Sequence, residues 1–166
     1  MVELLDYREN KQKLRKPGQI ITQEIISTPE FQTNLEEMKK ILAVDGVGLA
    51  ATQVNWGIQL FMLCIDEKLQ KIEPQIFINP VIRNYSKIKE KESEGCLSLP
   101  GLYLDLNRPI EIEWEYFNTK LEKFISYAKN YYARAVMHEI DHLNGKLMID
   151  YASAVQQLKI KKWMKG

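Results

Sequence analysis

Apolar and polar residues recur with two different periods along the chain, and these periods predict its strands and helices. From Ile110 to Phe117 the alternation is strict, with apolar and aromatic side chains on one face and three glutamates on the other. This period of two predicts a half-buried antiparallel strand, and residues 118–120 form the turn to a partner strand at 121–127. The run IQLFMLCI at 58–65 is apolar on both faces and predicts an internal strand.

Three segments have the spacing or the end signals of helices. The sequence STPE at residues 27–30 supplies a capping hydroxyl and a proline near the first helical position, and Gly46 ends the helix that follows. A second helix is predicted from about Asn130 to Asn144, and residues 153–166 form a third. Helices before and after a set of antiparallel strands predict an α+β fold.

Glycine and proline interrupt the pattern at two places. The run GVGLAATQV at residues 46–54 consists mostly of small side chains, and we expect another element or a ligand to approach its backbone. The apolar residues 76–78 form a short strand that Asn79 and Pro80 are expected to break. The charged residues 81–94 then form an exposed strand or loop.

Length and composition are those of one ordinary globular domain, residues 1–166, with 45% hydrophobic residues. The formal net charge of +1 predicts no general attraction to DNA or to membranes. Two cysteines do not suggest a disulfide framework, which favours a reducing compartment. The charged residues 1–16 contain no signal sequence or membrane-spanning stretch, so we expect a cytoplasmic protein.

The candidate chemistry lies in MHEIDHLNG, residues 137–145. His138 and His142 are one helical turn apart, so both imidazoles can reach a single metal ion, with Glu139 beside them. So short a pattern also arises by chance on helices whose histidines are packed or solvated. Here it contains both histidines of the chain. A catalytic zinc or iron site needs three protein ligands, so the third must be another residue type.

The third ligand is a choice between two cysteines. Met148 stands where a metzincin has its last histidine, which excludes that family. Cys64 lies in the apolar internal strand, where cysteine behaves as a small hydrophobe. Cys96 lies in EGCLSLPG, residues 94–101, where Gly95 lets the backbone come close to a metal or a substrate. Cys96 is therefore the better candidate.

Three separated segments together resemble the motifs of the peptide deformylase family: GVGLAATQ at 46–53, EGCLS at 94–98 and HEIDH at 138–142. The resemblance runs over most of the chain. It departs at Met137, where the family usually has glutamine, and at Tyr131 and Tyr132, which replace smaller aliphatic residues. We expect these departures to touch the surroundings of the metal and the pocket wall, and so to affect substrate preference and rate.

The resemblance implies antiparallel sheets packed around a central metal-bearing helix. It also implies a hydrolase that removes the formyl group from the N-terminal methionine of newly made proteins. It favours one Fe²⁺ ion per chain, and the ligand set also suits Zn²⁺ or another divalent transition metal. By position it assigns Cys96, His138 and His142 as metal ligands and Glu139 as general acid/base. The Gln53 amide and the Leu97 backbone N–H would donate to the oxygen that becomes negative during the reaction. Val47 and Gly48 would pair with the peptide through their backbone, and Val136 and Leu97 would be walls of the methionine pocket.

Two rival functions follow from the residues. An HExxH endopeptidase would need a third histidine or a well-placed downstream glutamate, and Asp150 is the only nearby carboxylate after the helix. A non-catalytic relative would keep the fold, although every matched catalytic position is filled.

We expect Glu94 and Arg108 to support the site structurally. In the family a C-terminal helix can dock on the ribosome, and four lysines here form either a solvated face or a contact to ribosomal RNA: Lys159, Lys161, Lys162 and Lys165.

Overall fold

The computed structural model describes residues 2–166. The helices in this part of the chain are α1 (Tyr7–Leu14), α2 (Gln23–Ile26), α3 (Pro29–Asp45), α4 (Asn130–Leu143) and α5 (Ala154–Trp163), with 3-10 helices η1 (Ala51–Val54) and η2 (Met148–Tyr151). The strands are β1 (Gly48–Ala50), β2 (Leu60–Ile65), β3 (Lys71–Tyr85), β4 (Lys89–Gly95), β5 (Tyr103–Pro109), β6 (Glu111–Phe117) and β7 (Lys123–Lys129). The predicted α+β class is confirmed.

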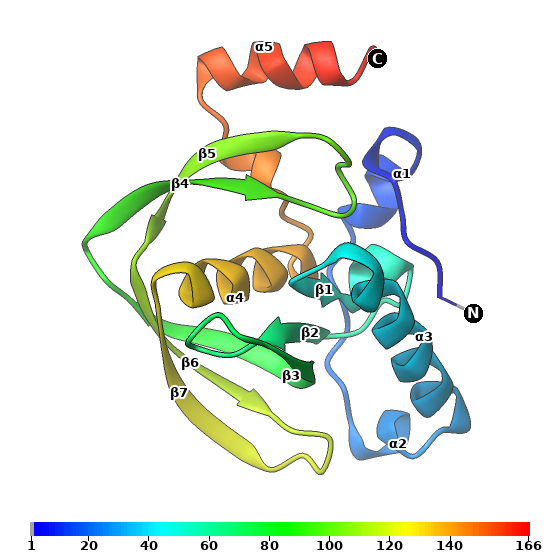
Figure 1. Cartoon of the computed structure of the whole chain (residues 1–166). Coiled ribbons are helices and arrows are strands. Elements are labelled where there is room, and N and C mark those ends of the chain that lie inside the picture. Colours follow the sequence, from blue (N-terminus) through cyan, green and yellow to red (C-terminus); the bar gives the residue numbers. More distant parts are fainter. Residues whose placement is uncertain (1) are drawn as a thin grey trace.

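Two antiparallel sheets enclose the central helix. Five strands form the larger sheet in the order β1-β2-β3-β6-β7, and β4 pairs with β5 in a separate two-stranded sheet. Helix α4 crosses the middle of the molecule, between the small sheet and the large one (Figure 1). This is the predicted arrangement of antiparallel sheets around a central helix.

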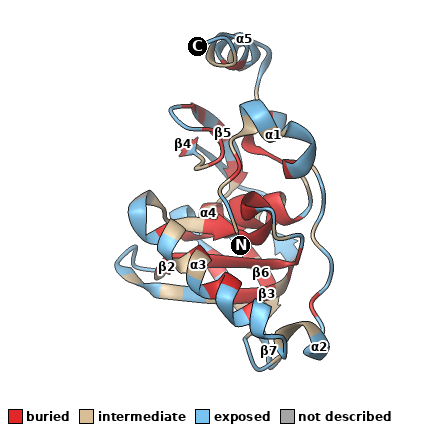
Figure 2. Ribbon diagram, turned by 90° about the vertical axis from the view of Figure 1, so that its right-hand side faces the viewer, coloured by how far each residue is buried: buried red, intermediate tan, exposed pale blue. Residues whose placement is uncertain are grey.

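The two faces of α4 differ in chemistry. Tyr132, Val136, Ile140 and Leu143 recur at helical spacing and pack on the large sheet, in one core cluster with Trp114 of β6. Buried residues are therefore concentrated in α4 and the strands beneath it (Figure 2). The other face of α4 carries the histidines and turns toward the small sheet.

The predicted break of the strand at Asn79 and Pro80 is wrong, because β3 continues through both residues. Asn79 takes a left-handed backbone conformation (φ 48°), and its side chain bonds the Ile21 N–H at 2.8 Å and the Ile21 carbonyl at 2.9 Å. The pairing of β3 with β6 shifts register between Ile78 and Val81. The strand thus passes the proline by a bulge held from outside the sheet.

The first turns of α3 and α5 are held by side-chain caps. Thr28 Oγ1 accepts from the Phe31 N–H at 3.2 Å, and Pro29 is the first residue of α3, as expected. Ser153 caps α5 in the same way, by accepting from the Gln156 N–H at 3.4 Å. None of the helices within residues 2–166 has both the length and the apolar character needed to cross a membrane.

Candidate metal centre

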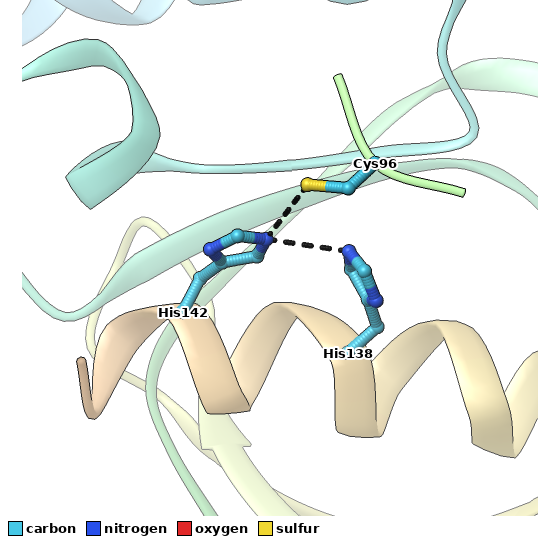
Figure 3. A group of neighbouring side chains, drawn as sticks. All are labelled: Cys96, His138 and His142. Carbon is cyan, nitrogen blue, oxygen red and sulfur yellow. Dashed lines mark hydrogen bonds between the residues drawn. The ribbon is translucent and has the colours of Figure 1, made fainter. Parts of the chain in front are cut away.

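Three side chains from two elements converge on one point. Cys96 directly follows β4, and His138 and His142 lie one turn apart on the inner face of α4 (Figure 3). His142 Nε2 lies 3.2 Å from Cys96 Sγ and 3.3 Å from His138 Nε2. The three donor atoms are within 4.8 Å of one another, so a single ion can contact them all. Thiolate and imidazole donors fit Zn²⁺ or Fe²⁺.

The two cysteines have very different surroundings. Cys64 is buried in the core between β2 and α3, and its thiol donates to the Gly46 carbonyl at 3.0 Å. Burial raises the pKa of the Cys64 thiol, which keeps it neutral. Cys96 lies at a bend next to Gly95, where a side chain would meet the Tyr103 ring 2.6 Å away. Cys64 is thus placed as the core residue predicted, and Cys96 beside the histidines.

A buried carboxylate orients His138. Glu94 Oε2 lies 3.2 Å from His138 Nδ1, and its carboxylate also accepts from Arg108 at 2.7 and 2.9 Å and from Arg134 at 2.6 Å. Burial opposes ionisation of Glu94, but His138 and Arg108 outweigh it and hold the pKa well below its usual range. A carboxylate can only accept, so Nδ1 carries a hydrogen, and Nε2 is the nitrogen turned toward His142. The expected supporting role of Glu94 and Arg108 has this physical basis.

The second histidine is kept neutral by its surroundings. His142 is 1% exposed, and both burial and the neighbouring His138 lower its pKa well below the ordinary value. A neutral imidazole is the form that binds a metal. The helix end that carries His142 is fixed through main-chain carbonyls, because Thr52 Oγ1 donates to His142 O at 3.0 Å and Gln59 Nε2 donates to Leu143 O at 3.0 Å.

Glu139 is buried beside the ligands without a partner for one oxygen. Its side chain is 4% exposed, and among residues 2–166 no group bonds its Oε2. Burial raises the pKa of Glu139 to about 7, although His138 counteracts the shift. A carboxyl with this pKa can both accept and release a proton near neutrality. Glu139 has room because residue 48 is a glycine, since a Cβ there would clash with Glu139 Oε1.

Gln53 is held so that its amide nitrogen faces the cysteine. Gln53 Oε1 accepts from the Ala50 N–H at 2.9 Å, and Nε2 lies 3.2 Å from Ser98 Oγ and 3.5 Å from Cys96 Sγ. The site opens into a cavity of about 380 Å³. Its lining contains most of the predicted site residues and several others: Gly46, Val47, Gly48, Gln53, Ser93, Glu94, Gly95, Cys96, Leu97, Pro100, Gly101, Tyr103, Tyr131, Ala135, His138 and Glu139.

The structure does not bring Val136 to this cavity. Val136 is fully buried against the large sheet, and Ala135, one residue earlier and about 100° away around the helix, lines the wall instead. Met137 also turns away from the metal site, into the core and a cavity on the far side of α4. Of the departures noted in the sequence, only Tyr131 lines the pocket, because Tyr132 packs in the core.

Asp150, the nearby acid that an endopeptidase would need, lies away from the histidines. Asp150 forms an ion pair with Arg15, with Oδ1 2.7 Å from Nη2, and it also accepts from the Leu147 N–H. It is absent from the group of residues that converge with the histidines. The third side chain that converges with the two histidines is thus a cysteine rather than a downstream carboxylate.

Sequence reasoning missed the residues that line the cavity from β5 and the turn before it. Pro100, Gly101 and Tyr103 line the side of the cavity opposite α4, and all three are exposed. The Pro-Gly pair marked a turn, but no signal in the sequence shows that a turn and a strand face a distant helix.

A cysteine, two histidines and a buried carboxyl with one oxygen unpaired among residues 2–166, beside an open cavity, define the class of this protein as a metal-dependent hydrolase. The polypeptide deformylase family matches residues 1–158 of the chain. A peptide deformylase of Pelagibacter ubique is 35% identical, over 92% of this chain and 91% of its own length.

Solved structures agree with the sequence relatives. A peptide deformylase from Plasmodium falciparum superposes with a TM-score of 0.86 at 30% identity, over 98% of this chain and 93% of that chain. The enzyme from Thermotoga maritima gives a TM-score of 0.79 at 32% identity, over 92% of this chain and 98% of that chain. The chain belongs to the polypeptide deformylase family.

Proposed function

We propose that this chain hydrolyses the formyl group from the N-terminal formyl-methionine of newly made polypeptides, with Cys96, His138 and His142 as metal ligands and Glu139 as general acid/base. One observation carries the proposal. The three candidate ligand atoms lie within 4.8 Å of one another, Cys96 and His138 line the cavity, and Glu139 beside them has one buried oxygen without a partner among residues 2–166.

We take the metal to be one Fe²⁺ ion per chain. One thiolate with two imidazoles also fits Zn²⁺, and the family resemblance favours iron. When bound, the ion would acidify the attacking water and polarise the formyl oxygen. The neutral state of His142 and the hydrogen bond from His138 Nδ1 to Glu94 prepare both rings for ligation.

We assign the proton transfers to Glu139 and the stabilisation of the formyl oxygen to Gln53 and Leu97. Glu139 takes a proton from the attacking water and delivers it to the leaving amine, for which a pKa of about 7 is well matched. The Gln53 amide and the Leu97 N–H donate to the formyl oxygen as it becomes negative. Gln53 suits this role because its other end is fixed by Ala50, so its N–H group is already in place.

The substrate chain would run along the free edge of the large sheet. Strand β1 is the terminal strand of that sheet, so Val47 and Gly48 can pair with an extended peptide as with an added strand. Leu97 and the residues Ala135 and Tyr131 of α4 then supply apolar wall for the methionine side chain.

We propose a cytoplasmic location and a contact with the ribosome, where the nascent substrate emerges. Lys161, Lys162 and Lys165 near the C-terminus are exposed and can contact ribosomal RNA. Lys159 is exposed too, but its ammonium donates to the Tyr103 carbonyl at 2.6 Å.

The test of the proposed function is the Glu139→Gln variant. This substitution keeps the size of the side chain and removes its ability to accept a proton. Protein purified without oxygen should retain its metal and bind formyl-methionyl peptides, while turnover falls by ~10² to 10⁴. Metal counts, peptide binding and release of formate are the measurements. A variant that loses metal, or that keeps its turnover, would contradict the role of Glu139, and cleavage of casein by the parent would favour the endopeptidase.

A further inference from the structure

Helix α5 is attached to the active-site cavity through polar side chains. Gln156 Nε2 donates to the Asp105 carbonyl at 2.8 Å, Lys159 Nζ to the Tyr103 carbonyl at 2.6 Å, and Trp163 Nε1 to the Pro100 carbonyl at 2.8 Å. The spacing i, i+3, i+7 puts the three donors on one face of α5. That face lies over β5 and the turn before it.

The carbonyls that accept these bonds belong to a free strand edge. Strand β5 pairs only with β4, so its second edge has unpaired backbone groups. The carbonyls of residues 103 and 105, two positions apart, point to the same edge of the strand, and both accept a hydrogen bond from α5. Helix α5 therefore covers the edge of the small sheet next to the cavity.

The same segment forms the outer rim of the cavity. Pro100, Gly101 and Tyr103 line it, are exposed, and lie opposite α4. A formyl peptide with its formyl carbon at the metal end must leave the cavity past this rim. The Tyr103 ring lies over the backbone of Gly95, where any Cβ would lie 2.6 Å from the ring.

Apolar burial alone does not fix the orientation of α5. Ile160 is the one buried residue of this helix, whereas Val155 is 78% and Leu158 66% exposed. The hydrogen bonds from Lys159 and Trp163 are directional, so they fix the orientation of α5 that the apolar contact leaves open. The Trp163 ring is itself held by Tyr7 of α1, at a centroid distance of 6.4 Å.

We propose that α5 is a positioning element of the active site, in which Lys159 and Trp163 hold the rim at Pro100 and Tyr103 so that it contacts the substrate chain beyond the formyl-methionine. This inference rests on the proposed function. It makes α5 a determinant of peptide affinity and leaves the chemical step to the metal ligands and Glu139.

The test compares two substrates in two variants of the metal-loaded full chain. Lys159→Met and Trp163→Phe each remove one donor and keep most of the side-chain volume. We expect the KM for a formyl-methionyl tripeptide to rise about fivefold in each, as the loss of one hydrogen bond implies. The kcat, and both constants for formyl-methionine amide, which has no further residue, should not change. Lys159→Arg, which restores a donor, should recover the parent KM.

Two further variants serve as controls. Leu158→Ala lies on the exposed side of α5, and Lys40→Met removes a positive charge from an exposed position of α3. Neither should alter the constants for either substrate. An unchanged KM for the tripeptide in both donor variants, or an equal loss with both substrates, would overturn the proposal.

Amide hydrogen exchange at residues 99–105 separates this inference from the proposed function. If the rim is held by α5, exchange there should be faster in Lys159→Met and Trp163→Phe than in the parent, and unchanged in Leu158→Ala. A parent without any deformylation would refute the proposed function, and the exchange data would still decide whether α5 holds the rim. Equal exchange in parent and donor variants would show that it does not.

Discussion

Glu139 can lie under β1 only because residue 48 has no side chain. A Cβ at Gly48 would clash with Glu139 Oε1 and would lie 2.8 Å from Leu63 Cδ2. Leu63 is fully buried in β2 and cannot move aside, so the carboxyl would have to shift. The glycine in this motif therefore has a steric purpose in addition to any backbone contact with the peptide.

The Gly48→Ala variant tests this steric relation. We expect it to retain metal and to lose about 10²-fold in kcat, because a displacement of about 1 Å in a catalytic group can have an effect of that size. Formate release and metal content are the measurements, and Gly57→Ala, at a site where an added Cβ meets nothing within 4 Å, is the matched control. A parent-like kcat would show that Glu139 tolerates the methyl group.

The two cysteines give a second prediction at the scale of single residues. Cys96→Ser should lower the bound metal strongly, because a neutral hydroxyl replaces a thiolate. Cys64→Ala should keep the metal and destabilise the fold by about 1 kcal/mol or a little more, as expected for a small core truncation. Metal content by elemental analysis and thermal unfolding are the measurements. Equal loss of metal in both variants would contradict the assignment.

The convergence of Cys96, His138 and His142 could be predicted because its signals are local. His138 and His142 are related by the geometry of one helix, and the glycine beside Cys96 distinguished it from Cys64. The pocket walls depend on the direction in which each side chain points around α4, and a short sequence motif does not determine that direction. A difference of one residue around α4 puts Ala135 in the cavity and Val136 in the core.

Among the elements, those with an apolar period or a continuous apolar run were predicted, whereas most of the polar ones were not. Strand β6 and its partner β7 follow from strict alternation and the turn between them. Strand β4 has no period to detect, since Glu94 is the buried side chain among its residues KEKESEG. It is a strand because β5 pairs with it and because Arg108 and Arg134 neutralise Glu94. Helices α1 and α2 are short and mostly polar.

The end of α4 is tied to the N-terminal helix by one ion pair. Asp150 in η2 bonds Arg15 just after α1, and Gly145 (φ 70°) lets the chain pass against the Arg15 backbone. Burial opposes ionisation of Asp150, but the bonds from Arg15 and the Leu147 N–H outweigh it, so its pKa lies below the ordinary value. The pair therefore contributes to stability only while the carboxyl is ionised.

This pair predicts a pH-dependent effect of Asp150→Asn. A lowered pKa in the folded state means that the contribution is present above the ordinary carboxyl pKa near 4 and is lost as the pH falls through the folded value. The variant should be less stable than the parent by about 0.5 kcal/mol at pH 7, a value reduced for solvent screening. The difference should disappear on acidification. Urea unfolding of both proteins from pH 7 to pH 3 measures it, and a constant difference would contradict the assignment.

At the scale of the whole molecule, the site exists because two sheets meet on opposite sides of one helix. The helix α4 lies between the two sheets (Figure 1). The large sheet buries the apolar face of α4, and β4 with the residue after it brings Glu94 and Cys96 to the polar face. The sequence pattern predicted antiparallel strands and the helix, and the family resemblance implied sheets around it, but neither gave the division of the strands between two sheets. That division depends on pairing between β4 and β5, which no apolar period in β4 reveals.

The C-terminal end of the molecule has two different surfaces, and this predicts how it would meet a ribosome. The face of α5 with Lys159 and Trp163 is turned to the rim, whereas Lys161, Lys162 and Lys165 are exposed. If the exposed lysines contact ribosomal RNA, the protein should co-sediment with ribosomes, and added salt should weaken the binding because phosphate contacts release counterions.

Replacement of Lys161, Lys162 and Lys165 by glutamine should abolish this co-sedimentation and leave deformylation of free peptides intact, because these side chains lie outside the cavity. The matched control replaces three exposed lysines elsewhere, Lys40, Lys68 and Lys120, which removes the same charge. Loss of binding in the first variant alone would assign the contact to α5. Equal loss in both would indicate a general charge effect, and binding that persists in both would make the lysines of α5 a solvated face.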